Sequence, residues 1–570
     1  MTSNITDKGL NLKSWLPVIV LIIIAIVIRL YRTSSENYYL LAGSDGPYFP
    51  LQVKSLIEHA HLAFSDMPLL FLLGSLLSKI LYFFHIGTEN ECILLSVRYI
   101  DAFLPPLSAI PVFLIAKELT NKKIKSNFSI YLMVAFAILN YTPLFIFSYQ
   151  LQKNGLAVFF VFFYIYYIIR TLKYENRTDF MKAFFALILC ALTHFGSFGL
   201  LIFASLMVFI FWIFNHTNKR NLISIKKILF IAAIFVFIFS IIAVFDFERF
   251  LRIVHAPIKI FEAPVILFAL IGQNYLLHGQ TLIILVLTNI LAIQGIILIF
   301  RHRSVMDRYI VIIGLSFAAC AIFLSNPFLG LEWANRLFIM AYIPLTILYL
   351  IIFNTISSRW IRIPTIFIFI FLLGMSFLRA LLDKPLLSIS QDALTEFQQI
   401  NNQVNFKEND AIVSRQDLRL LANWTFGSKG VSDYLLTKYE YTKFNAVYFI
   451  KQIKGMNSIF RDPGRPIPND YSIIYKGNYF EVYKIEDAKE LPTSPQKVFK
   501  GIIGTIVENS ENRLLVKDNK TGKVRTVFIK NMQQKNLNLQ NGMMVEINGE
   551  WTPFSLAINA ETIKEIKSSR

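Results

Sequence analysis

GSDGPYFPLQVKSLIEHAHLAFSDMPLLFLL, residues 43 to 73, follows the first apolar segment of the chain. This loop places two carboxylates, Asp45 and Asp66, between apolar segments, and a Pro-led apolar run begins at Pro68. Acidic side chains beside aromatic residues at the border of apolar segments indicate a site at a membrane surface. The topology of the flanking segments therefore decides on which side of the membrane the two acids lie.

The composition is that of an integral membrane protein. Of 570 residues, 55% are hydrophobic, 16% are charged and 53 are Phe, and the mean hydropathy is +0.52. These values are far from those of soluble domains. Apolar runs close to the roughly 20 residues that cross a bilayer recur up to Leu382. We predict a polytopic α-helical transmembrane domain over residues 1–382, with an acidic first outer loop at 32–91. Its expected spans are 15–31, 92–116, 127–148, 153–169, two within 181–214, and 228–245, 281–300, 309–325, 336–353 and 363–381.

Two segments decide the number of spans. The run 181–214 would form a helix about 50 Å long, too long for a hydrocarbon core of about 30 Å, so we expect a hairpin turning at Thr193 to Ser197. The positive-inside rule places the basic clusters in the cytoplasm only if 181–214 crosses twice and 68–84 lies in the outer interface. The prediction is about eleven spans in the cell membrane, with the N-terminus cytoplasmic and Asp45, Asp66 and the C-terminal region extracytoplasmic. The clusters are at Lys8/Lys13, Lys117–Lys125, Arg170–Lys182, Lys219–Lys227, Arg301–Arg308 and Arg359/Arg362.

Charge and cysteine content exclude several classes of protein. The net charge of +19 fits this topology and contact with anionic membrane lipids, and it does not indicate a nucleic-acid partner. Cys92, Cys190 and Cys320 lie far apart in apolar segments, so we expect neither a disulfide framework nor a zinc site. Arg29 and Arg32 follow the first apolar run without a small-residue cleavage site, so it is expected to remain as a helix.

The C-terminal part has the composition of soluble domains. Short alternating runs such as AIVSR and YFEVYKI predict an extracytoplasmic α/β domain over 383–486, with a helix at 392–404. After the linker EDAKELPTSP, about five strand-like runs predict an OB-like β-barrel over 497–570. Such barrels often bind oligonucleotides or oligosaccharides, and a purely structural appendage is the alternative.

With these residues in view, the chain resembles the GT-C glycosyltransferases. The resemblance rests on an Asp in GSDGPY, on the acid before the Pro-led helix in SDMPLLFLLGSLL, and on VRYIDAFLPPLSAIPVFLIAKEL. It covers about 15–382, is strongest over 43–118, and is closest in layout to the protein O-mannosyltransferase and aminoarabinose-transferase branches. It implies an enzyme that moves a sugar from a polyprenyl-phosphate carrier to a protein, lipid or glycan acceptor on the outer membrane face, with inversion.

The resemblance implies Asp45 as the catalytic base and Asp66 as the second acid. A carboxylate that takes the proton of an acceptor hydroxyl in the transition state contributes about 10²- to 10⁴-fold. A turn-forming role in Gly-Ser-Asp-Gly-Pro remains the alternative for Asp45, and an N-cap role at the helix start remains the alternative for Asp66. Tyr48 and Gln52 share the loop and are expected to line the sugar pocket.

Other candidate substrate contacts come from later segments. Arg98 and Asp101, at i and i+3, are expected to pair with each other, and the resemblance also allows Arg98 to orient the acidic loop. The resemblance gives Arg336 the role of gripping the carrier phosphate, against an interfacial anchor as the alternative. Gln150 and Lys153 lie in an outer connection, where Lys153 is a second phosphate contact or an anchor. His194 falls at the hairpin turn, where a structural role is the alternative to substrate binding.

The same superfamily includes oligosaccharyltransferases, which usually hold a divalent metal through an acidic motif in the second outer loop and read their sequon with Trp-Trp-Asp. Here FSYQLQKNG, residues 147–155, has no acid, and NWTFG at Asn423 lacks the doubled Trp and the Asp. We expect no certain cofactor, with a divalent cation (Mg or Mn) as the alternative, and no whole-glycan transfer to Asn. An oligosaccharyltransferase-like enzyme, a lipid-linked sugar transporter and a non-catalytic envelope-glycan assembly protein remain the alternatives.

Overall fold

The computed structural model describes most of the chain in two compact units. Among the described residues, the first unit ends at Leu387 and the second begins at Ser388. Each unit is treated separately below. The described residues are 12–34, 38–43, 45–120, 127–148, 151–216, 240, 251, 279–326, 328–329, 336–355, 359–382, 387–407, 410–427, 429–432, 444–454, 472–485, 499–510, 513–520, 524–529, 539–552 and 557–566.

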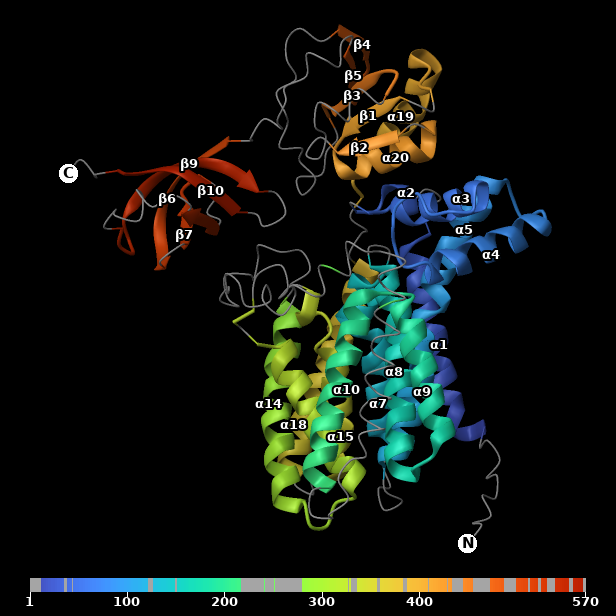
Figure 1. Ribbon diagram of the computed structural model, residues 1–570, viewed down its shortest axis with the longest axis vertical. Helices are drawn as coiled ribbons and strands as arrows, with labels where there is room; N and C mark the ends of the chain where they lie inside the picture. Colours follow the sequence, from blue (N-terminus) through green and yellow to red (C-terminus); the bar gives the residue numbers. More distant parts are fainter. Residues whose placement is uncertain are drawn as a thin grey trace. The chain divides into compact units, whose positions relative to one another are not determined.

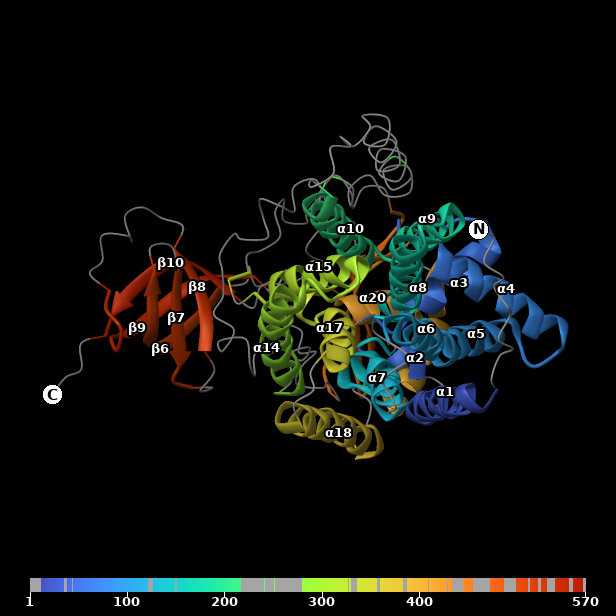
Figure 2. The same cartoon turned by 90° about the horizontal axis from the view of Figure 1, so that it is seen from below.

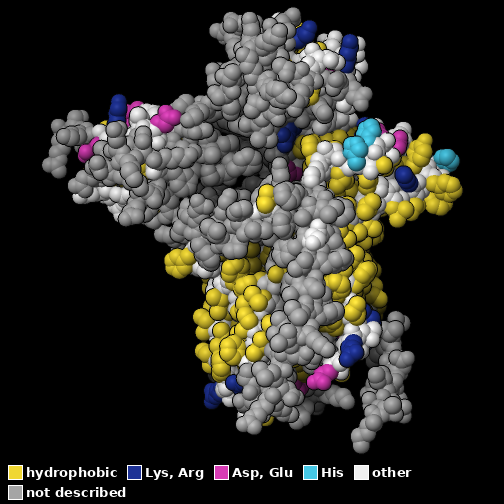
Figure 3. Space-filling model, in the orientation of Figure 1, with side chains coloured by type: hydrophobic (Ala, Val, Ile, Leu, Met, Phe, Trp, Pro, Cys, Tyr) yellow, Lys and Arg dark blue, Asp and Glu magenta, His cyan; other side chains and the backbone are white. Residues whose placement is uncertain are grey.

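The first unit is a bundle of long apolar helices (Figures 1 and 2). Eight helical segments among the described residues are long and apolar enough to cross a membrane. Exposed apolar side chains such as Leu16, Ile23 and Val27 line the outer helices, and Figure 3 shows hydrophobic side chains over the flank of the bundle. Exposed apolar faces of this kind contact lipid, so the first unit is that of a membrane protein. The long helices are α1 (Leu12–Arg32), α7 (Asn127–Leu139), α8 (Gln152–Tyr174), α9 (Arg177–Ala191), α10 (Phe195–His216), α14 (Gly279–His302), α15 (Arg308–Leu324), α17 (Tyr342–Thr355) and α18 (Arg359–Leu382).

The helices differ in how much of their surface packs inside the bundle. Of the apolar windows of Phe128–Ile146 and Arg336–Phe353, 83% and 89% are buried, whereas the value is 22% for both Lys13–Arg32 and Arg362–Leu382. In Figure 2, accordingly, α7 and α17 lie inside while α1 and α18 lie at the periphery. The inner helices therefore form the core, and the outer helices carry the lipid-facing surface.

Most of the predicted spans have a matching helix. The hairpin within 181–214 is present, since α9 ends at Ala191 and α10 begins at Phe195. With 15 and 17 residues, α9 and α15 are shorter than the eight candidate spans. The predicted span 228–245 lies outside the described residues apart from residue 240.

The predicted helix 92–116 is interrupted. It consists of α5 (Glu89–Phe103), a 3₁₀ turn at Pro105–Ser108 and α6 (Ala109–Leu119). Pro105 and Pro106 cannot donate backbone hydrogen bonds and clash with a continuing helix, so the chain changes direction there.

The acidic loop contains three helices. These are α2 (Tyr38–Leu41), α3 (Tyr48–His59) and α4 (Leu69–Phe83), and Figure 1 shows α4 running across the direction of the long helices. One face of α4 packs inward through Phe71 and Gly74, while Leu72 and Leu76 are exposed. Since α4 and α9 both have 15 residues, the direction of α4 across the long helices, and not its length, agrees with the predicted interfacial position.

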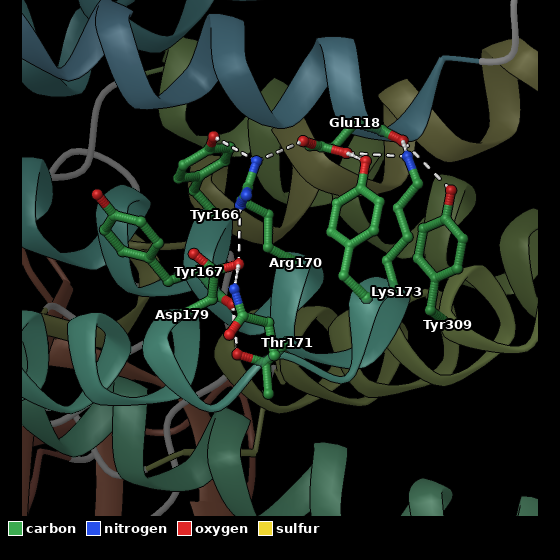
Figure 4. A network of polar contacts seen from close by, with 10 residues as sticks. Glu118, Tyr166, Tyr167, Arg170, Thr171, Lys173, Asp179 and Tyr309 are labelled. Atoms are coloured by element: carbon green, nitrogen blue, oxygen red, sulfur yellow. Dashed lines mark hydrogen bonds and ion pairs between the residues drawn. The ribbon is translucent and has the colours of Figure 1, made fainter. Parts of the chain in front are cut away.

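A charged network joins four helices at the end of the bundle away from this loop (Figure 4). Glu118, at the end of α6, accepts from Lys173 Nζ at 2.8 Å and from Arg170 Nη1 at 3.3 Å. Arg170 Nε also donates to Asp179 at 3.1 Å, and Tyr309 at the start of α15 donates to the Glu118 carbonyl at 3.2 Å. Arg170 and Lys173 of one predicted cytoplasmic cluster therefore bind Glu118, an acid that lies within another, at one end of the bundle.

Glu118→Gln is expected to lower the free energy of unfolding by about 1.5–3 kcal/mol, because hydrogen bonds to charged groups are lost and Lys173 and Arg170 keep their charges. The side chain of Glu118 is only 13% exposed, so water replaces these bonds poorly. Thermal unfolding of the purified protein measures the change, beside Glu175→Gln, which alters an exposed acid of the same region. Equal midpoints for the two variants would contradict the role of the network.

The second unit begins with a mixed sheet of strand order β2-β1-β3-β5-β4. Two helices accompany this sheet, and β1 runs parallel to β2 and β3, whereas β5 is antiparallel to β3 and β4. In its core, Phe397 stacks on Phe426 and contacts Phe480 edge to face. The elements are α19 (Gln391–Val404), β1 (Ala411–Ser414), α20 (Gln416–Phe426), β2 (Lys429–Ser432), β3 (Val447–Gln452), β4 (Ser472–Lys476) and β5 (Phe480–Ile485).

The last part of the second unit is a closed five-stranded barrel of order β10-β8-β7-β6-β9. Alternating inward residues such as Leu514, Val516 and Val545 are fully buried in it. Closure leaves no exposed sheet edge. The strands are β6 (Phe499–Ser510), β7 (Arg513–Asp518), β8 (Val524–Ile529), β9 (Met544–Thr552) and β10 (Ala557–Glu565).

Candidate functional site

Asp45 lies in a tight turn that leads into α3. The Tyr48 amide donates to the Asp45 carbonyl at 3.1 Å, and the Asp45 side chain is half-buried. A Cβ on Gly46 would come within 2.5 Å of the Ala42 carbonyl oxygen, so this close approach requires glycine. The turn-forming alternative therefore describes the backbone here, and Asp45 as a whole residue is only partly buried.

Gln52 holds the return of the loop against α3. Its amide oxygen accepts from the Phe64 amide at 3.0 Å, and its Nε2 donates to the Phe64 carbonyl at 2.9 Å and to the Tyr48 hydroxyl at 3.0 Å. Ser55 adds a hydrogen bond to the His61 carbonyl at 2.9 Å. Because Gln52 is fully buried, its visible task is to shape the loop, and contact with a sugar stays a prediction.

The loop brings Asp66 to Lys153, which lies 87 residues further along the chain. One carboxylate oxygen of Asp66 accepts from both Lys153 Nζ and the Tyr48 hydroxyl, and the other accepts from the Met67 amide at 2.7 Å. The Asp66 side chain is 0% exposed, whereas that of Lys153 is 15% exposed. Three predicted site residues, Tyr48, Asp66 and Lys153, thus form one cluster, called the Asp66 cluster below.

The N-cap alternative for Asp66 is wrong. Helix α4 begins at Leu69 after Pro68, and no side chain caps it. The carboxylate of Asp66 is instead engaged with Lys153 from the first turn of α8. The Leu69 amide donates to the Leu192 carbonyl at 3.0 Å, which fixes the start of α4 to the α9–α10 turn.

A second buried network, around Arg29 and Asp101, connects the acidic loop to the first membrane helix. Arg29 in α1 pairs with Asp101 at 3.4 Å, and both residues are 1% exposed. Asp101 also accepts from Tyr39 in α2 at 2.8 Å and from Ser148 at 3.3 Å. Because Tyr39 lies in the short helix just before the Asp45 turn, this network anchors that turn to the membrane helices.

The predicted Arg98–Asp101 pair is wrong. Asp101 pairs with Arg29 instead, and Arg98 donates to the Leu30 carbonyl at 3.1 Å. An i, i+3 spacing allowed the local pair, but a partner 72 residues away in the sequence takes the carboxylate. Arg98 thus braces α5 against α1, and a direct role toward the acidic loop stays a prediction.

The arginines of α1 explain an irregular turn in the neighbouring span. Thr142–Ile146 forms a π-helical turn that contains Pro143. Arg29 Nη2 donates to the Pro143 carbonyl at 2.8 Å, and Arg32 Nη1 donates to the Leu144 carbonyl at 3.0 Å. These contacts satisfy carbonyls that a regular helix would pair internally. Sequence reasoning had used Arg29 and Arg32 only to mark the end of the first span.

Three further predicted residues are His194, Arg336 and Gln150. His194 bonds to the Ser197 amide and hydroxyl at 3.1 Å, which is the structural role that the sequence left as the alternative. Arg336 is exposed where the span Arg336–Phe353 begins. Gln150 lies outside the described residues.

A divalent cation does not fit the donor groups of the site. No group of three His, Cys, Asp or Glu side chains that could hold a metal occurs in the described part of the chain. Both oxygens of Asp66 accept hydrogen bonds, and the Lys153 ammonium contacts one of them. A divalent ion about 4 Å from that ammonium would be repelled by about 8 kcal/mol at an effective dielectric constant of about 20. Magnesium and manganese prefer several oxygen ligands, which this donor set does not offer.

Comparison with known proteins gives a similarity of fold. No protein-family model and no curated protein matches the sequence. Among solved structures, the oligosaccharyltransferase of Archaeoglobus fulgidus in its apo form is similar, with a TM-score of 0.50 over 76% of this chain and 69% of that chain. The chain shares its overall fold with that structure. At 10% sequence identity this likeness concerns the fold alone, and it does not distinguish the branches of the superfamily.

Proposed function

We propose that this GT-C-like protein is a membrane glycosyltransferase that moves a sugar from a polyprenyl-phosphate carrier to an acceptor hydroxyl, with inversion. The observation that carries the proposal is the Asp66 cluster, in which a buried acid of the loop meets a cation from α8, while Tyr48 of the same cluster also donates its amide to the Asp45 carbonyl. The fold similarity to a membrane oligosaccharyltransferase supports the enzyme class.

The two acids are suited to different tasks. Asp66 is fully buried and hydrogen-bonded through both oxygens, so it is poorly placed to receive a proton from a substrate. Asp45 is half-buried and keeps solvent access. We therefore assign Asp45 as the general base and Asp66 as the acid that holds Lys153.

The reaction needs both a base and a cation. The acceptor oxygen attacks the anomeric carbon while Asp45 takes its proton, and the bond from that carbon to the carrier phosphate oxygen breaks. The leaving group is the polyprenyl phosphate, whose developing charge a nearby cation stabilises. Lys153 is proposed for that contact, and Arg336 stays the second candidate from the sequence.

Transfer of a whole oligosaccharide is the second candidate, because the fold neighbour is an oligosaccharyltransferase. The sequence favours the first candidate, since FSYQLQKNG has no acid and no Trp-Trp-Asp motif occurs.

The extracytoplasmic placement of the loop also stays part of the proposal. It rests on the basic residues Lys117, Lys173 and Arg170, which belong to one end of the bundle, the end that the positive-inside rule assigns to the cytoplasm. Lys117 bonds to Ser14 near the beginning of α1 at 3.3 Å, which puts the start of the first helix at the same end.

The two enzymatic candidates are distinguished by donor class. Purified protein in lipid nanodiscs is incubated with radiolabelled polyprenyl-monophosphate monosaccharides and, separately, with polyprenyl-pyrophosphate oligosaccharides. We expect label to be transferred or released only from a monophosphate donor. Release only from pyrophosphate donors would favour the second candidate, and release from neither would favour the transporter or assembly alternatives.

A further inference from the structure

Lys153 is the cation that the fold builds into the candidate site. It lies in the first turn of α8 and reaches across to the acidic loop, where it meets Asp66 and lies 5.6 Å from the centre of the Tyr48 ring. Its side chain keeps 15% of its surface exposed, whereas the Asp66 side chain has none. Of this ion pair, Lys153 is therefore the member that an incoming anion can reach.

The negative charge of Asp66 is shared among three hydrogen-bond donors, of which Lys153 is one. The Tyr48 hydroxyl donates to the same Asp66 oxygen as Lys153, and the Met67 amide donates to the other. Each of these donors lowers the negative charge that the carboxylate presents to the ammonium. The carrier phosphate, singly charged in the donor and doubly charged once the sugar has left, can therefore compete for the ammonium, while Asp66 keeps its other two donors.

A neighbouring side chain independently points to a missing acceptor. Gln152 is 2% exposed, and its Nε2 has no hydrogen-bond partner among the described residues. A buried donor without an acceptor is unfavourable, and it adjoins Lys153 at the N-terminus of a 23-residue helix, where the helix dipole favours anions. An anionic ligand at Lys153 would meet a cation and a favourable dipole, and the unsatisfied donor of Gln152 belongs to the same helical turn.

We infer that the Lys153 ammonium, held by Asp66 and Tyr48, takes the place of a divalent cation and binds the phosphate of the lipid carrier directly. The inference rests on the proposed function, and it adds that phosphate binding requires Lys153 and no divalent metal. The inference and the exclusion of a divalent ion rest on the same contact, because the Lys153 ammonium occupies the space beside the Asp66 carboxylate.

The test measures binding of farnesyl phosphate, a short polyprenyl monophosphate, to the full chain in nanodiscs, with uncharged farnesol as the comparison. We expect farnesyl phosphate to bind at least about 10-fold more tightly than farnesol, equally with added EDTA, Mg²⁺ or Mn²⁺. Lys153→Gln should remove this preference for the phosphate and leave farnesol binding unchanged, whereas Lys153→Arg should retain part of it.

Matched variants separate binding from folding. Lys54→Gln changes a lysine of α3 in the acidic loop that is 20% exposed and pairs with Glu58, and it should leave phosphate binding unchanged. Because Lys153→Gln leaves Asp66 buried without its cation, the double variant Asp66→Asn/Lys153→Gln is included. It should recover thermal stability and still fail to prefer the phosphate. Lys153→Asp places a second carboxylate beside Asp66. Added Mn²⁺ should therefore raise the unfolding midpoint of this variant and leave that of the wild type unchanged.

Two results would overturn the inference. One is loss of phosphate binding by the wild type in EDTA with recovery in Mn²⁺. The other is an unchanged phosphate preference in Lys153→Gln. If the wild type still transfers sugar, either result contradicts the inference about Lys153 and does not contradict the proposed function. If the wild type neither prefers the phosphate nor transfers sugar, both the inference and the proposed function are contradicted.

Discussion

Asp45→Asn is expected to reduce sugar transfer by about 10²- to 10⁴-fold, because the amide cannot take the proton of the acceptor hydroxyl. The substitution keeps the size of the side chain, and the turn is held by the backbone contact from Tyr48 to the Asp45 carbonyl. The free energy of unfolding should therefore change by no more than about 1 kcal/mol. Initial rates with saturating donor and acceptor, and thermal unfolding of the same preparations, measure both quantities.

The control for this variant is Glu58→Gln, which neutralises an exposed acid of the same loop. It should retain transfer, because Glu58 lies on the outer face of α3 and pairs only with exposed or partly exposed cations among its recorded contacts. If Asp45→Asn transferred sugar as fast as Glu58→Gln, another group would have to be the base.

Asp101→Ala is expected to cause the largest loss of stability, about 3–5 kcal/mol, because it leaves the Arg29 guanidinium buried without its acid. Both side chains are almost fully inaccessible, so water cannot replace the lost partner. The variant also removes the acceptor of the Tyr39 hydroxyl, which ties α2 to the bundle. We therefore expect a lower unfolding midpoint together with weaker transfer.

Asp307→Ala, which removes an exposed acid of the same unit, provides the reference and should change stability by no more than about 0.5 kcal/mol. The double variant Arg29→Met/Asp101→Leu should be more stable than Asp101→Ala, since it removes the stranded charge and fills the space with apolar atoms. An unfolding midpoint for Asp101→Ala equal to that of Asp307→Ala would show that the pair does not hold the loop.

Features governed by local composition could be predicted from the sequence. Apolar runs of span length and the polar centre of 181–214 predicted the helices and the hairpin at residues 192–194, because both depend on hydropathy. The break at Pro105–Ser108 was visible as two consecutive prolines, yet the apolar pattern outweighed it in the prediction of a single helix. The closed five-stranded barrel follows the predicted strand runs, and its assignment to the OB type stays a prediction.

Pairings between distant segments could not be read from the sequence. Asp101 has an arginine three residues before it, but its partner Arg29 lies in another helix, and spacing cannot rank two such cations. Asp66 and Lys153 were both singled out as candidates, but nothing in the sequence indicated that they meet. Burial decides both cases, because a carboxylate removed from water must take the cation that packing brings to it.

The most direct test of the central claim is sugar transfer from a panel of radiolabelled polyprenyl-phosphate sugars by purified wild-type protein, run beside Asp45→Asn. We predict transfer or hydrolysis from at least one monophosphate donor by the wild type and its loss in Asp45→Asn. Silence of the folded wild type across the panel, or equal activity of the two proteins, would contradict the account.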